Sequence, residues 1–167
     1  MQITIRRATV EDAASVADVL NAVIAEGGLT IFDRPFLVHD EKRFLSTLGP
    51  RSAVHVATID GDLVGVQSVD LFSDLGPPVS HVATMGTWLR SEARGRGIGR
   101  KLSGASIGFA RSNGYTKIVI QVLAGNDRAL RFYRRLGFTD IGTARQHVRL
   151  AGQLHDEIYL ELLLNPD

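Results

Sequence analysis

The sequence predicts an α/β protein whose sheet contains both antiparallel and parallel neighbours. Residues 53–59 and 63–72 are strand-like and flank Asp60-Gly61, a dipeptide that strongly signals an antiparallel hairpin. Residues 81–136 then alternate between strand-like and helix-like segments, which is typical of a strand, helix, strand unit with parallel pairing. The chain has 167 residues, which is enough to bury a hydrophobic core without disulfides or a structural metal, so we expect one domain spanning residues 1–167.

The N-terminal part predicts one strand and two helices. Residues 2–8 alternate apolar and polar side chains, as a half-buried strand does. Thr9 with Asp12 resembles a capping box, and the apolar residues that follow recur at helical spacing until two consecutive glycines end the helix. Residues 29–38 are expected to form a loop, and residues 39–48 a short second helix.

Strands and helices alternate in the second half of the chain. The first helix there has an apolar stripe, which predicts core positions at Ile98, Leu102, Ala105 and Phe109. Two glycines in the same helix, Gly104 and Gly108, are expected to let it lie close to the sheet. The elements expected in this half are helices at 98–113 and 126–136 and strands at 81–90, at 116–123, from 138 onward and around 157–162.

Composition excludes several classes of function. The net charge of +1 and the 22% of charged residues lack the excess that nucleic-acid binding requires, so we expect no nucleic-acid partner. The chain has no cysteines, which excludes disulfides, thiolate metal sites and a cysteinyl intermediate, and its five histidines lack metal-ligand spacing. No apolar run approaches about 18 residues and the N-terminus lacks a signal peptide, so we expect a cytoplasmic protein without membrane contact.

A glycine-rich turn, residues 94–99, joins an apolar extended run to an amphipathic helical run. Glycines let the backbone approach an anion, and the unpaired N–H groups of the first helical turn point at it. Arg94, Arg96 and Arg100 add positive charge. The turn matches neither a P-loop nor a dinucleotide fingerprint. A polyphosphate site is therefore the functional interpretation, and a solvated loop that enters a helix is the alternative.

Two motifs together resemble the GCN5-related N-acetyltransferase (GNAT) superfamily. Arg94, Gly97 and Gly99 match its R/Q-x-x-G-x-G/A element, and residues 126–138 look like its N-x-x-A-x-x-x-Y-x-x-x-G-F element. The match covers most of the chain and is nearest to the branch that includes phosphinothricin and amino-acid N-acetyltransferases. The resemblance implies a central, mostly antiparallel sheet with one parallel pair and flanking helices, and acetyl-coenzyme A (acetyl-CoA) as co-substrate.

The resemblance also implies which residues hold the donor. Backbone amides of the glycine turn would bind the pyrophosphate, and strand backbone before it would pair with the pantetheine arm. Tyr133 would protonate the departing thiolate, because a phenol with an ordinary pKa of about 10 is protonated at neutral pH. The alternative for Tyr133 is a tyrosine that only packs on the sheet. For Asn126, for which the resemblance implies contact with the donor, the alternative is a residue that caps the helix. The expected donor-binding residues are Trp88, Leu89, Arg90, Arg94, Gly95, Arg96, Gly97, Ile98, Gly99, Arg100, Asn126 and Tyr133.

The sequence departs from the family pattern at the base that would neutralise the amine. Many relatives place a glutamate on the strand before the glycine turn, but residues 81–90 contain no carboxylate. Glu92 follows the strand end, where a solvent-facing charge is expected. His81 and Asp70 are therefore the candidate bases, acting directly or through a water, with a structural role as the alternative for both.

The missing strand carboxylate favours an acceptor amine with a low pKa. Neutralising an α-amine at pH 7 costs about 1 kcal/mol, whereas a lysine-like amine costs roughly 4.6 kcal/mol. We therefore expect a small amino acid or amino-acid-like amine as acceptor. Its pocket is expected from the irregular segments 26–36, 73–80 and 147–156, with ordinary loop packing as the alternative and with substrate-binding residues Phe32, Arg34 and Phe36.

The sequence thus predicts an enzyme, an acetyl-CoA-dependent N-acetyltransferase in which a small-molecule primary amine attacks the thioester directly. Two alternatives stay open. One is a non-catalytic module that binds or senses acyl-CoA, and the other is an acetyltransferase of protein N-termini or lysines. A homodimer is compatible with the sequence, which identifies neither the oligomeric state nor the acceptor, the base or the preferred acyl chain.

Overall fold

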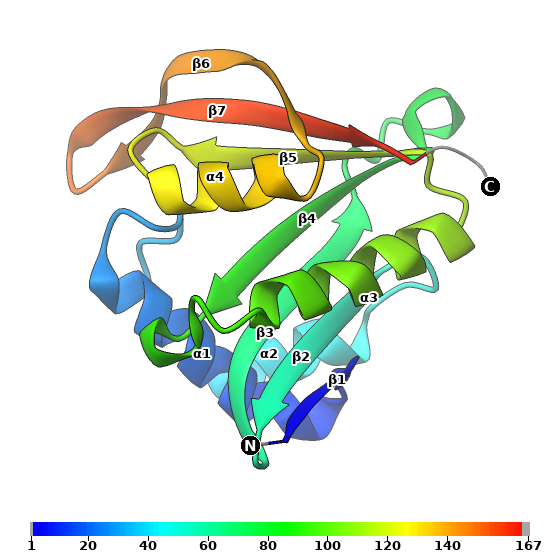
Figure 1. Ribbon diagram of the computed structural model, residues 1–167, viewed down its shortest axis with the longest axis vertical. Helices are drawn as coiled ribbons and strands as arrows, with labels where there is room; N and C mark the ends of the chain where they lie inside the picture. The colour runs from blue at the N-terminus through cyan, green and yellow to red at the C-terminus, as the bar shows by residue number, and fades with distance from the viewer. Residues whose placement is uncertain (1, 165–167) are drawn as a thin grey trace.

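The computed structural model describes residues 2–164, which form a seven-stranded mixed sheet with four α-helices (Figure 1). The strand order is β1-β2-β3-β4-β5-β7-β6, and all neighbours are antiparallel except β4 and β5. The fold class expected from the sequence is confirmed. The strands are β1 (Ile3–Arg7), β2 (Ala53–Ile59), β3 (Asp62–Leu71), β4 (Val82–Leu89), β5 (Lys117–Leu123), β6 (Thr139–Leu150) and β7 (Gln153–Leu163).

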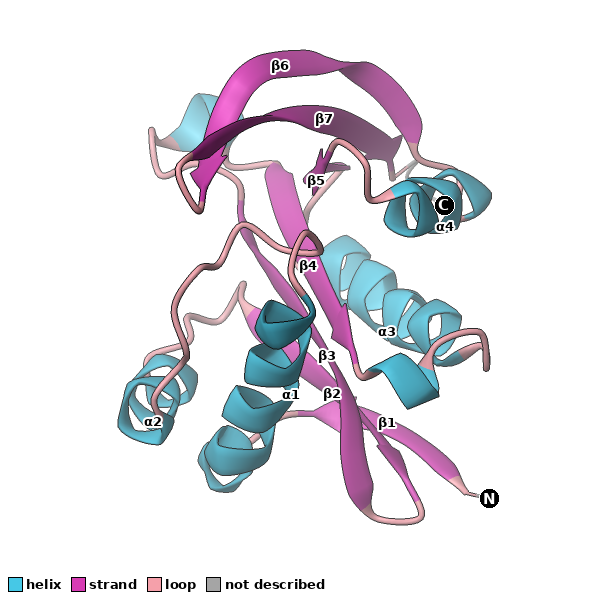
Figure 2. Cartoon of the chain, turned by 90° about the vertical axis from the view of Figure 1, so that its left-hand side faces the viewer, coloured by secondary structure: helices cyan, strands magenta, loops and turns pink. Residues whose placement is uncertain are grey.

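The helices cover both faces of the sheet, two on each side. Figure 2 shows α1 and α2 on one face and α3 and α4 on the other. A buried cluster around Val16, Leu20 and Val66 lies on the first face, and a second cluster around Ile118, Leu160 and Tyr133 lies on the other. The helices are α1 (Ala13–Glu26), α2 (Val38–Ser46), α3 (Ile98–Ser112) and α4 (Asp127–Arg135).

Local signals in the first half of the chain are reproduced closely. The Thr9 and Asp12 capping box forms at a short 3-10 turn that leads into α1, and the chain leaves α1 at Gly27 with a φ of 73°. Asp60 and Gly61 join β2 to β3 with positive φ values of 50° and 101°, as a two-residue hairpin turn requires. These elements follow from short-range rules, so the sequence predicts them well.

The expectation for the glycines of α3 was wrong. Gly104 and Gly108 are exposed, and a Cβ on either would meet no atom within 4 Å. The helix instead turns Ser103 and Ser106 towards the sheet, both fully buried. The reason is that β2 and β3 present polar side chains to this face, and the serine hydroxyls bond them. Close approach occurs at Gly99, where a Cβ would lie 3.1 Å from the Phe132 ring.

The segment 147–156, expected to be irregular, is mostly strand. β6 extends to Leu150 and β7 begins at Gln153, with a tight turn at Ala151 and Gly152 whose φ values are 47° and 79°. The expectation failed because a polar, half-exposed hairpin lacks the apolar alternation that marks a strand in sequence. Among residues 2–164, no helix has the length and apolar character needed to cross a membrane.

Candidate active site

The sheet opens between its two parallel strands. β4 and β5 pair only at residues 82–84 with 117–119, although both strands continue beyond these pairs and diverge in Figure 1. Arg90 N donates to Val64 O on β3 at 3.0 Å. Because backbone groups alternate in direction along a strand, the N–H and C=O of Trp88 also point to β3, whereas those of Thr87 and Leu89 point to the open side. An open strand edge of this kind can pair with an extended ligand.

The turn after β4 enters α3 through two glycines in the left-handed conformation. Gly95 and Gly97 have φ values of 75° and 77°, where a side chain costs roughly 1 kcal/mol or more. The first backbone bond into α3 runs from Lys101 N to Gly97 O at 3.1 Å. Helix geometry therefore leaves the preceding amides without an acceptor inside the helix. These amides and the positive end of the helix dipole favour an anion at this point.

A cleft of about 1040 Å³ connects the open strand edge with this anion site. Its walls come from β4, the glycine turn, α4 and the C-terminal end of α1. The volume reaches the upper end of the usual range for ligand pockets, about 300 to 1000 Å³. Most of the residues expected to bind the donor line this cleft, namely Leu89, Arg94, Gly95, Gly97, Gly99, Arg100, Asn126 and Tyr133.

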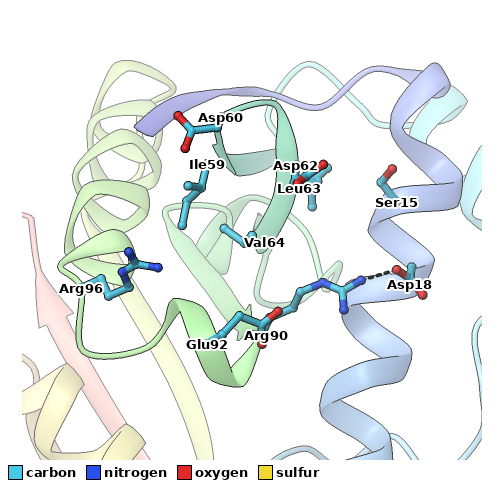
Figure 3. Close-up of a pocket in the computed structure, with 10 residues that line it drawn as sticks. All are labelled: Ser15, Asp18, Ile59, Asp60, Asp62, Leu63, Val64, Arg90, Glu92 and Arg96. Carbon is cyan, nitrogen blue, oxygen red and sulfur yellow. Dashed lines mark hydrogen bonds and ion pairs between the residues drawn. The ribbon is translucent and has the colours of Figure 1, made fainter. Parts of the chain in front are cut away.

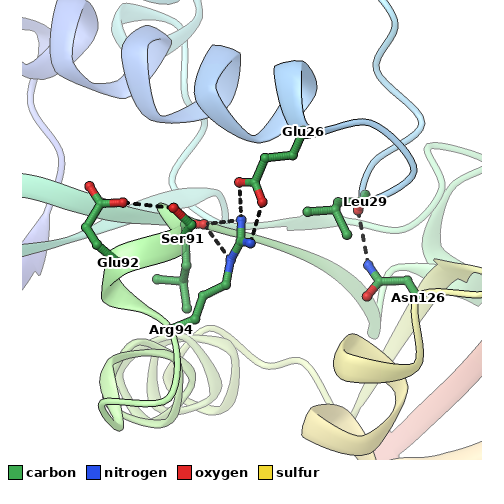
Figure 4. A network of polar contacts seen from close by, with 7 residues as sticks. Glu26, Leu29, Ser91, Glu92, Arg94 and Asn126 are labelled. Carbon is green, nitrogen blue, oxygen red and sulfur yellow. Dashed lines mark hydrogen bonds and ion pairs between the residues drawn. The ribbon is translucent and has the colours of Figure 1, made fainter.

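The Arg94 side chain forms hydrogen bonds within the protein that occupy its guanidinium group. Its guanidinium donates to both Glu26 carboxylate oxygens at 2.6 and 2.5 Å and to the Leu89 carbonyl at 2.8 and 3.0 Å (Figure 4). Glu26 neutralises the charge that the sequence had suggested for a phosphate. Arg94 therefore joins the end of α1 to the end of β4 and fixes the mouth of the cleft.

Two more of the expected arginines point into a different hollow. Arg90 and Arg96 line a depression of about 520 Å³ beside the β2–β3 hairpin, with Asp60, Asp62 and Glu92 among its other walls (Figure 3). Arg90 forms an ion pair with Asp18 of α1. Their side chains are thus not placed in the larger cleft. The hollow is lined by charges of both signs, so no single charged ligand is favoured there.

Positive charge in the large cleft comes from Arg100 and from two residues that the sequence analysis did not assign, Arg128 and Arg135. All three are exposed and line the cleft, the last two from α4. The signal for them was the cluster of basic residues at 128–135. With Arg94 neutralised, these three side chains provide the counter-charge for an anionic ligand.

Tyr133 is buried at the inner part of the cleft, with 6% of its surface exposed. Its Oη lies 2.7 Å from Thr87 Oγ1 on β4. Burial raises the pKa of Tyr133 to about 12, and the hydrogen bond with Thr87 acts in the opposite direction. The phenol therefore stays protonated through the neutral range and can donate to an anion in the cleft.

Asn126 caps α4, which is the structural role that the sequence offered as an alternative to a donor contact. Its Oδ1 accepts from Ala129 N at 3.2 Å. Its Nδ2 donates to the Leu29 carbonyl at 3.3 Å, the contact that Figure 4 shows. The residue also lines the cleft. It therefore orients the helix that carries Tyr133 and links it to the loop after α1.

The structure does not bring His81 and Asp70 to Tyr133. His81 precedes β4, six positions before Thr87, or about 20 Å along the strand. Asp70 is exposed, accepts from Ser52 Oγ at 2.6 Å and pairs in register with Thr84, on the face opposite Tyr133. His81 is therefore remote from Tyr133, and Asp70, which lies on the sheet face that carries Trp88, has its carboxylate hydrogen-bonded to Ser52.

Two of the three expected substrate-binding residues form an aromatic cluster with Trp88. Phe32 meets Phe36 edge to face at 4.9 Å and stacks on Trp88 at 5.8 Å. The cluster closes the loop after α1 against the face of β4 that α1 covers. Arg34 does not join it, since its side chain is 91% exposed and its ion-pair partner is Asp33 at 4.0 Å.

A buried carboxylate on β7 was missed by the sequence analysis. Glu157 is 5% exposed and lies opposite Leu123, the last residue of β5. Its neighbour Ile158 packs towards Tyr133, so Glu157 faces the other side of the sheet. Burial raises the pKa of the Glu157 carboxyl. No hydrogen bond to this carboxylate occurs within residues 2–164, and its oxygens are not fully buried.

A bulge in β6 brings one imidazole to Glu157. The register shifts between Ala144 and Val148, and His147 in this bulge places Nε2 3.9 Å from the Glu157 carboxylate. The same nitrogen lies 3.4 Å from Tyr159 Oη. Bulges commonly re-aim side chains near functional sites. Register shifts within the β6–β7 hairpin create this cluster, and no sequence motif marks them.

Comparison with known proteins places this fold among the N-acetyltransferases. A phosphinothricin acetyltransferase of Sinorhizobium meliloti, solved in complex with acetyl-CoA, superposes with a TM-score of 0.89 at 21% identity, covering 99% of this chain and 90% of that one. At this level of identity, the comparison shows that the two proteins share the same fold.

Sequence comparison then gives the family. Residues 25–138 match the Acetyltransferase (GNAT) family, and the chain belongs to it. N-alpha-acetyltransferase RimI of Mycobacterium tuberculosis is 30% identical over 140 residues, 84% of each chain. The L-methionine sulfoximine/L-methionine sulfone acetyltransferase of Pseudomonas aeruginosa is 25% identical over 170 residues, 99% of this chain and 97% of the relative. The family and the enzyme class expected from the sequence are confirmed.

Proposed function

We propose that the protein moves an acetyl group from acetyl-CoA to the primary α-amine of a small amino acid or amino-acid-like compound, by direct attack. Residues 1–167 would act as one N-acyltransferase domain, although residues 1 and 165–167 lie outside the described part. The observation that carries the proposal is the cleft in which an open strand edge, an anion site and the Tyr133 phenol converge.

An extended thioester with a diphosphate head fits this cleft. The pantetheine arm would pair with the open edge of β4 at Thr87 and Leu89, although the Leu89 carbonyl already accepts from Arg94. The diphosphate would meet the amides of residues 95–100, with Arg100, Arg128 and Arg135 as counter-charges. The acetyl-CoA bound in the Sinorhizobium meliloti protein supports this choice of donor.

Tyr133 would serve as the acid for the departing thiolate. A coenzyme A thiolate leaves as a base that needs a hydrogen-bond donor, and the protonated phenol beside Thr87 is the donor that the cleft supplies. The attacking nitrogen must be neutral, and an α-amine reaches that state at pH 7 for about 1 kcal/mol. Weak help from a base is therefore sufficient for this acceptor.

The acceptor would lie on the sheet face that carries Trp88 and Glu157, opposite the Tyr133 face. The aromatic cluster of Phe32, Phe36 and Trp88 would contact its apolar part. Glu157, rather than His81 or Asp70, would attract its ammonium group, because its carboxylate lies beside the end of β5 and makes no hydrogen bond within residues 2–164, whereas the Asp70 carboxylate accepts from Ser52. The relatives named for methionine sulfoximine and for N-alpha-acetylation both support an acceptor of the α-amino class.

A thiol-release assay tests the proposal. The protein is incubated with acetyl-CoA and a panel of amines, namely single amino acids, short peptides with free N-termini, and polyamines, and free coenzyme A is followed with a thiol reagent. We expect the fastest release with an α-amino acid. Faster turnover of peptides would favour the N-terminal acetyltransferase suggested by the RimI relative. Faster turnover of a polyamine would contradict the α-amine proposal.

A further inference from the structure

A buried chain of polar side chains leads from the centre of the sheet to Tyr133. Gln67 on β3 is fully buried, and its Nε2 lies 2.7 Å from Thr87 Oγ1 and 3.1 Å from Ser103 Oγ. Thr87 Oγ1 then lies 2.7 Å from Tyr133 Oη. Four elements, β3, β4, α3 and α4, therefore contribute to one continuous hydrogen-bonded chain that ends at the proposed acid.

The hydrogen bonds of Gln67 give this chain a direction. Its amide nitrogen has two hydrogens and meets two hydroxyl oxygens, whereas Oε1 has no partner among the described residues. The opposite amide orientation would bury the NH₂ group without an acceptor, and orphaned N–H donors are rarer in proteins than under-satisfied carbonyls. Gln67 therefore donates to Thr87.

The direction continues to Tyr133. The Thr87 oxygen accepts from Gln67, so its own hydroxyl hydrogen needs an acceptor, and within residues 2–164 the Tyr133 oxygen is the acceptor in range. Once Tyr133 accepts from Thr87, its phenolic hydrogen is not used inside the protein. Both Thr87 and Tyr133 line the cleft, so this hydrogen is directed to the space where the thioester would lie.

We propose that Gln67 and Thr87 are positioning residues that aim the Tyr133 proton at the departing thiolate and hold the phenolate that results. The inference rests on the proposed function. In the step, the nitrogen–carbon bond forms and the carbon–sulfur bond breaks. Sulfur takes the Tyr133 proton, Thr87 donates to the phenolate, and the amine loses its proton to solvent. Solvent in the cleft then returns one proton to Tyr133, so the protons balance.

A double-mutant cycle tests the proposal in the full-length protein. Thr87→Val removes the hydroxyl at nearly constant volume, and Thr87→Ser restores it. We expect Thr87→Val to lower kcat about tenfold with KM for acetyl-CoA changed less than twofold, and Thr87→Ser to recover most of kcat. In the Tyr133→Phe background, Thr87→Val should have no further effect. An equal loss in both backgrounds would mean that Thr87 acts independently of Tyr133, and the proposal would fall.

Gln67→Met extends the test one step along the chain. We expect a smaller loss of kcat, about threefold, that also disappears in the Tyr133→Phe background. Thermal melting and the Kd for acetyl-CoA show whether each variant keeps its fold and its cleft. A loss of kcat that tracks only a lower Tm would indicate a structural role and would contradict the proposal.

A second measurement does not need turnover. The Cζ resonance of labelled tyrosine reports whether the phenol oxygen accepts a hydrogen bond, and the chain has only three tyrosines. The Tyr133 signal, assigned with Tyr133→Phe, should move in Thr87→Val and return in Thr87→Ser. An unchanged signal would overturn the proposal even in an active enzyme. A moved signal in a protein that releases no thiol would instead count against the proposed function alone.

Discussion

The donor cleft and the acceptor side of this protein are built in different ways. The donor cleft depends on backbone groups from two nearly continuous segments, the end of β4 with the glycine turn and the start of α4. The acceptor side depends on side chains from the loop after α1, from β4, from β7 and from a bulge in β6. Backbone recognition leaves a local sequence motif, whereas a pocket of distant side chains does not.

The largest expected effect on kcat concerns Tyr133, the proposed acid between the donor cleft and the acceptor side. Tyr133→Phe should lower kcat by about 100-fold or more, because it removes the proton donor and leaves the ring in place. The Kd for acetyl-CoA should change less than about twofold. Steady-state kinetics and calorimetry measure the two quantities, and an unchanged kcat would show that the thiolate leaves without this phenol.

The same residue makes a prediction about pH. The pKa of Tyr133 is raised to about 12, so the phenol is fully protonated well below that value. Activity should therefore show no loss from this group between pH 8 and pH 10. A basic limb in kcat within that range that is absent from Tyr133→Phe would contradict the assignment.

The second effect tests the backbone anion site. Gly97→Val places a β-branched side chain at a φ of 77° and disturbs the amides of the turn, so the Kd for acetyl-CoA should rise at least about tenfold. Arg100→Ala removes one exposed charge and should raise it only about two- to fivefold. Equal losses for both variants would mean that side chains, not amides, hold the donor.

The matched control is Gly104→Ala on the same helix. Gly104 is exposed, has open space at its Cβ position and lies outside the cleft. This change should raise the free energy of unfolding by roughly 0.5 to 1 kcal/mol, as for glycine to alanine inside a helix, and leave donor binding unchanged.

The third effect tests the acceptor side. Glu157→Gln should raise KM for the acceptor about tenfold, because the ammonium loses its carboxylate, while the Tm at pH 7 stays equal or rises. The pKa of Glu157 is raised by burial, so the fold favours the protonated form. Wild-type stability from this group is then present at acid pH and is lost as pH rises through the raised pKa. Any stability advantage of the variant should accordingly disappear at acid pH in thermal melts.

The smallest effect separates two residues of the loop after α1. Phe32→Ala should raise KM for the acceptor severalfold, because Phe32 packs on Trp88. Arg34→Ala should change it less than about twofold, because the Arg34 side chain is almost fully exposed. A larger effect for Arg34 in the same kinetic assay would show that the loop closes over the acceptor and brings this arginine inward.

The sequence predicted the fold well because its decisive signals are local. The Asp60-Gly61 turn, the capping box and the glycine turn each fix a few adjacent dihedral angles, and the structure reproduces all three. The inner face of α3 was predicted only in part: Ile98 and Leu102 are fully buried, as the apolar stripe predicts, but two serines are buried beside them. Its inner face is set by Gln67 and His55, which bond Ser103 and Ser106 from strands more than 30 residues away in sequence.

The candidate site shows the same division. The motif residues lie where the sequence put them, yet the Arg94 side chain is bound by Glu26, which is 68 positions away and unrelated to any motif. Glu157 appears in the sequence as one charge in an alternating strand, and only the pairing of β7 with β5 buries it next to the end of β5. Long-range pairing thus decides which charges remain available to a ligand.

The central claim is that backbone amides at the start of α3 hold the diphosphate of the donor. Calorimetric titration with acetyl-CoA and with S-acetylpantetheine, which lacks the diphosphate, tests it most directly. We expect saturable binding of one acetyl-CoA per chain, at least about tenfold tighter than S-acetylpantetheine, with most of this difference lost in Gly97→Val. Equal affinity for the two thioesters, or no saturable heat with acetyl-CoA, would contradict the account.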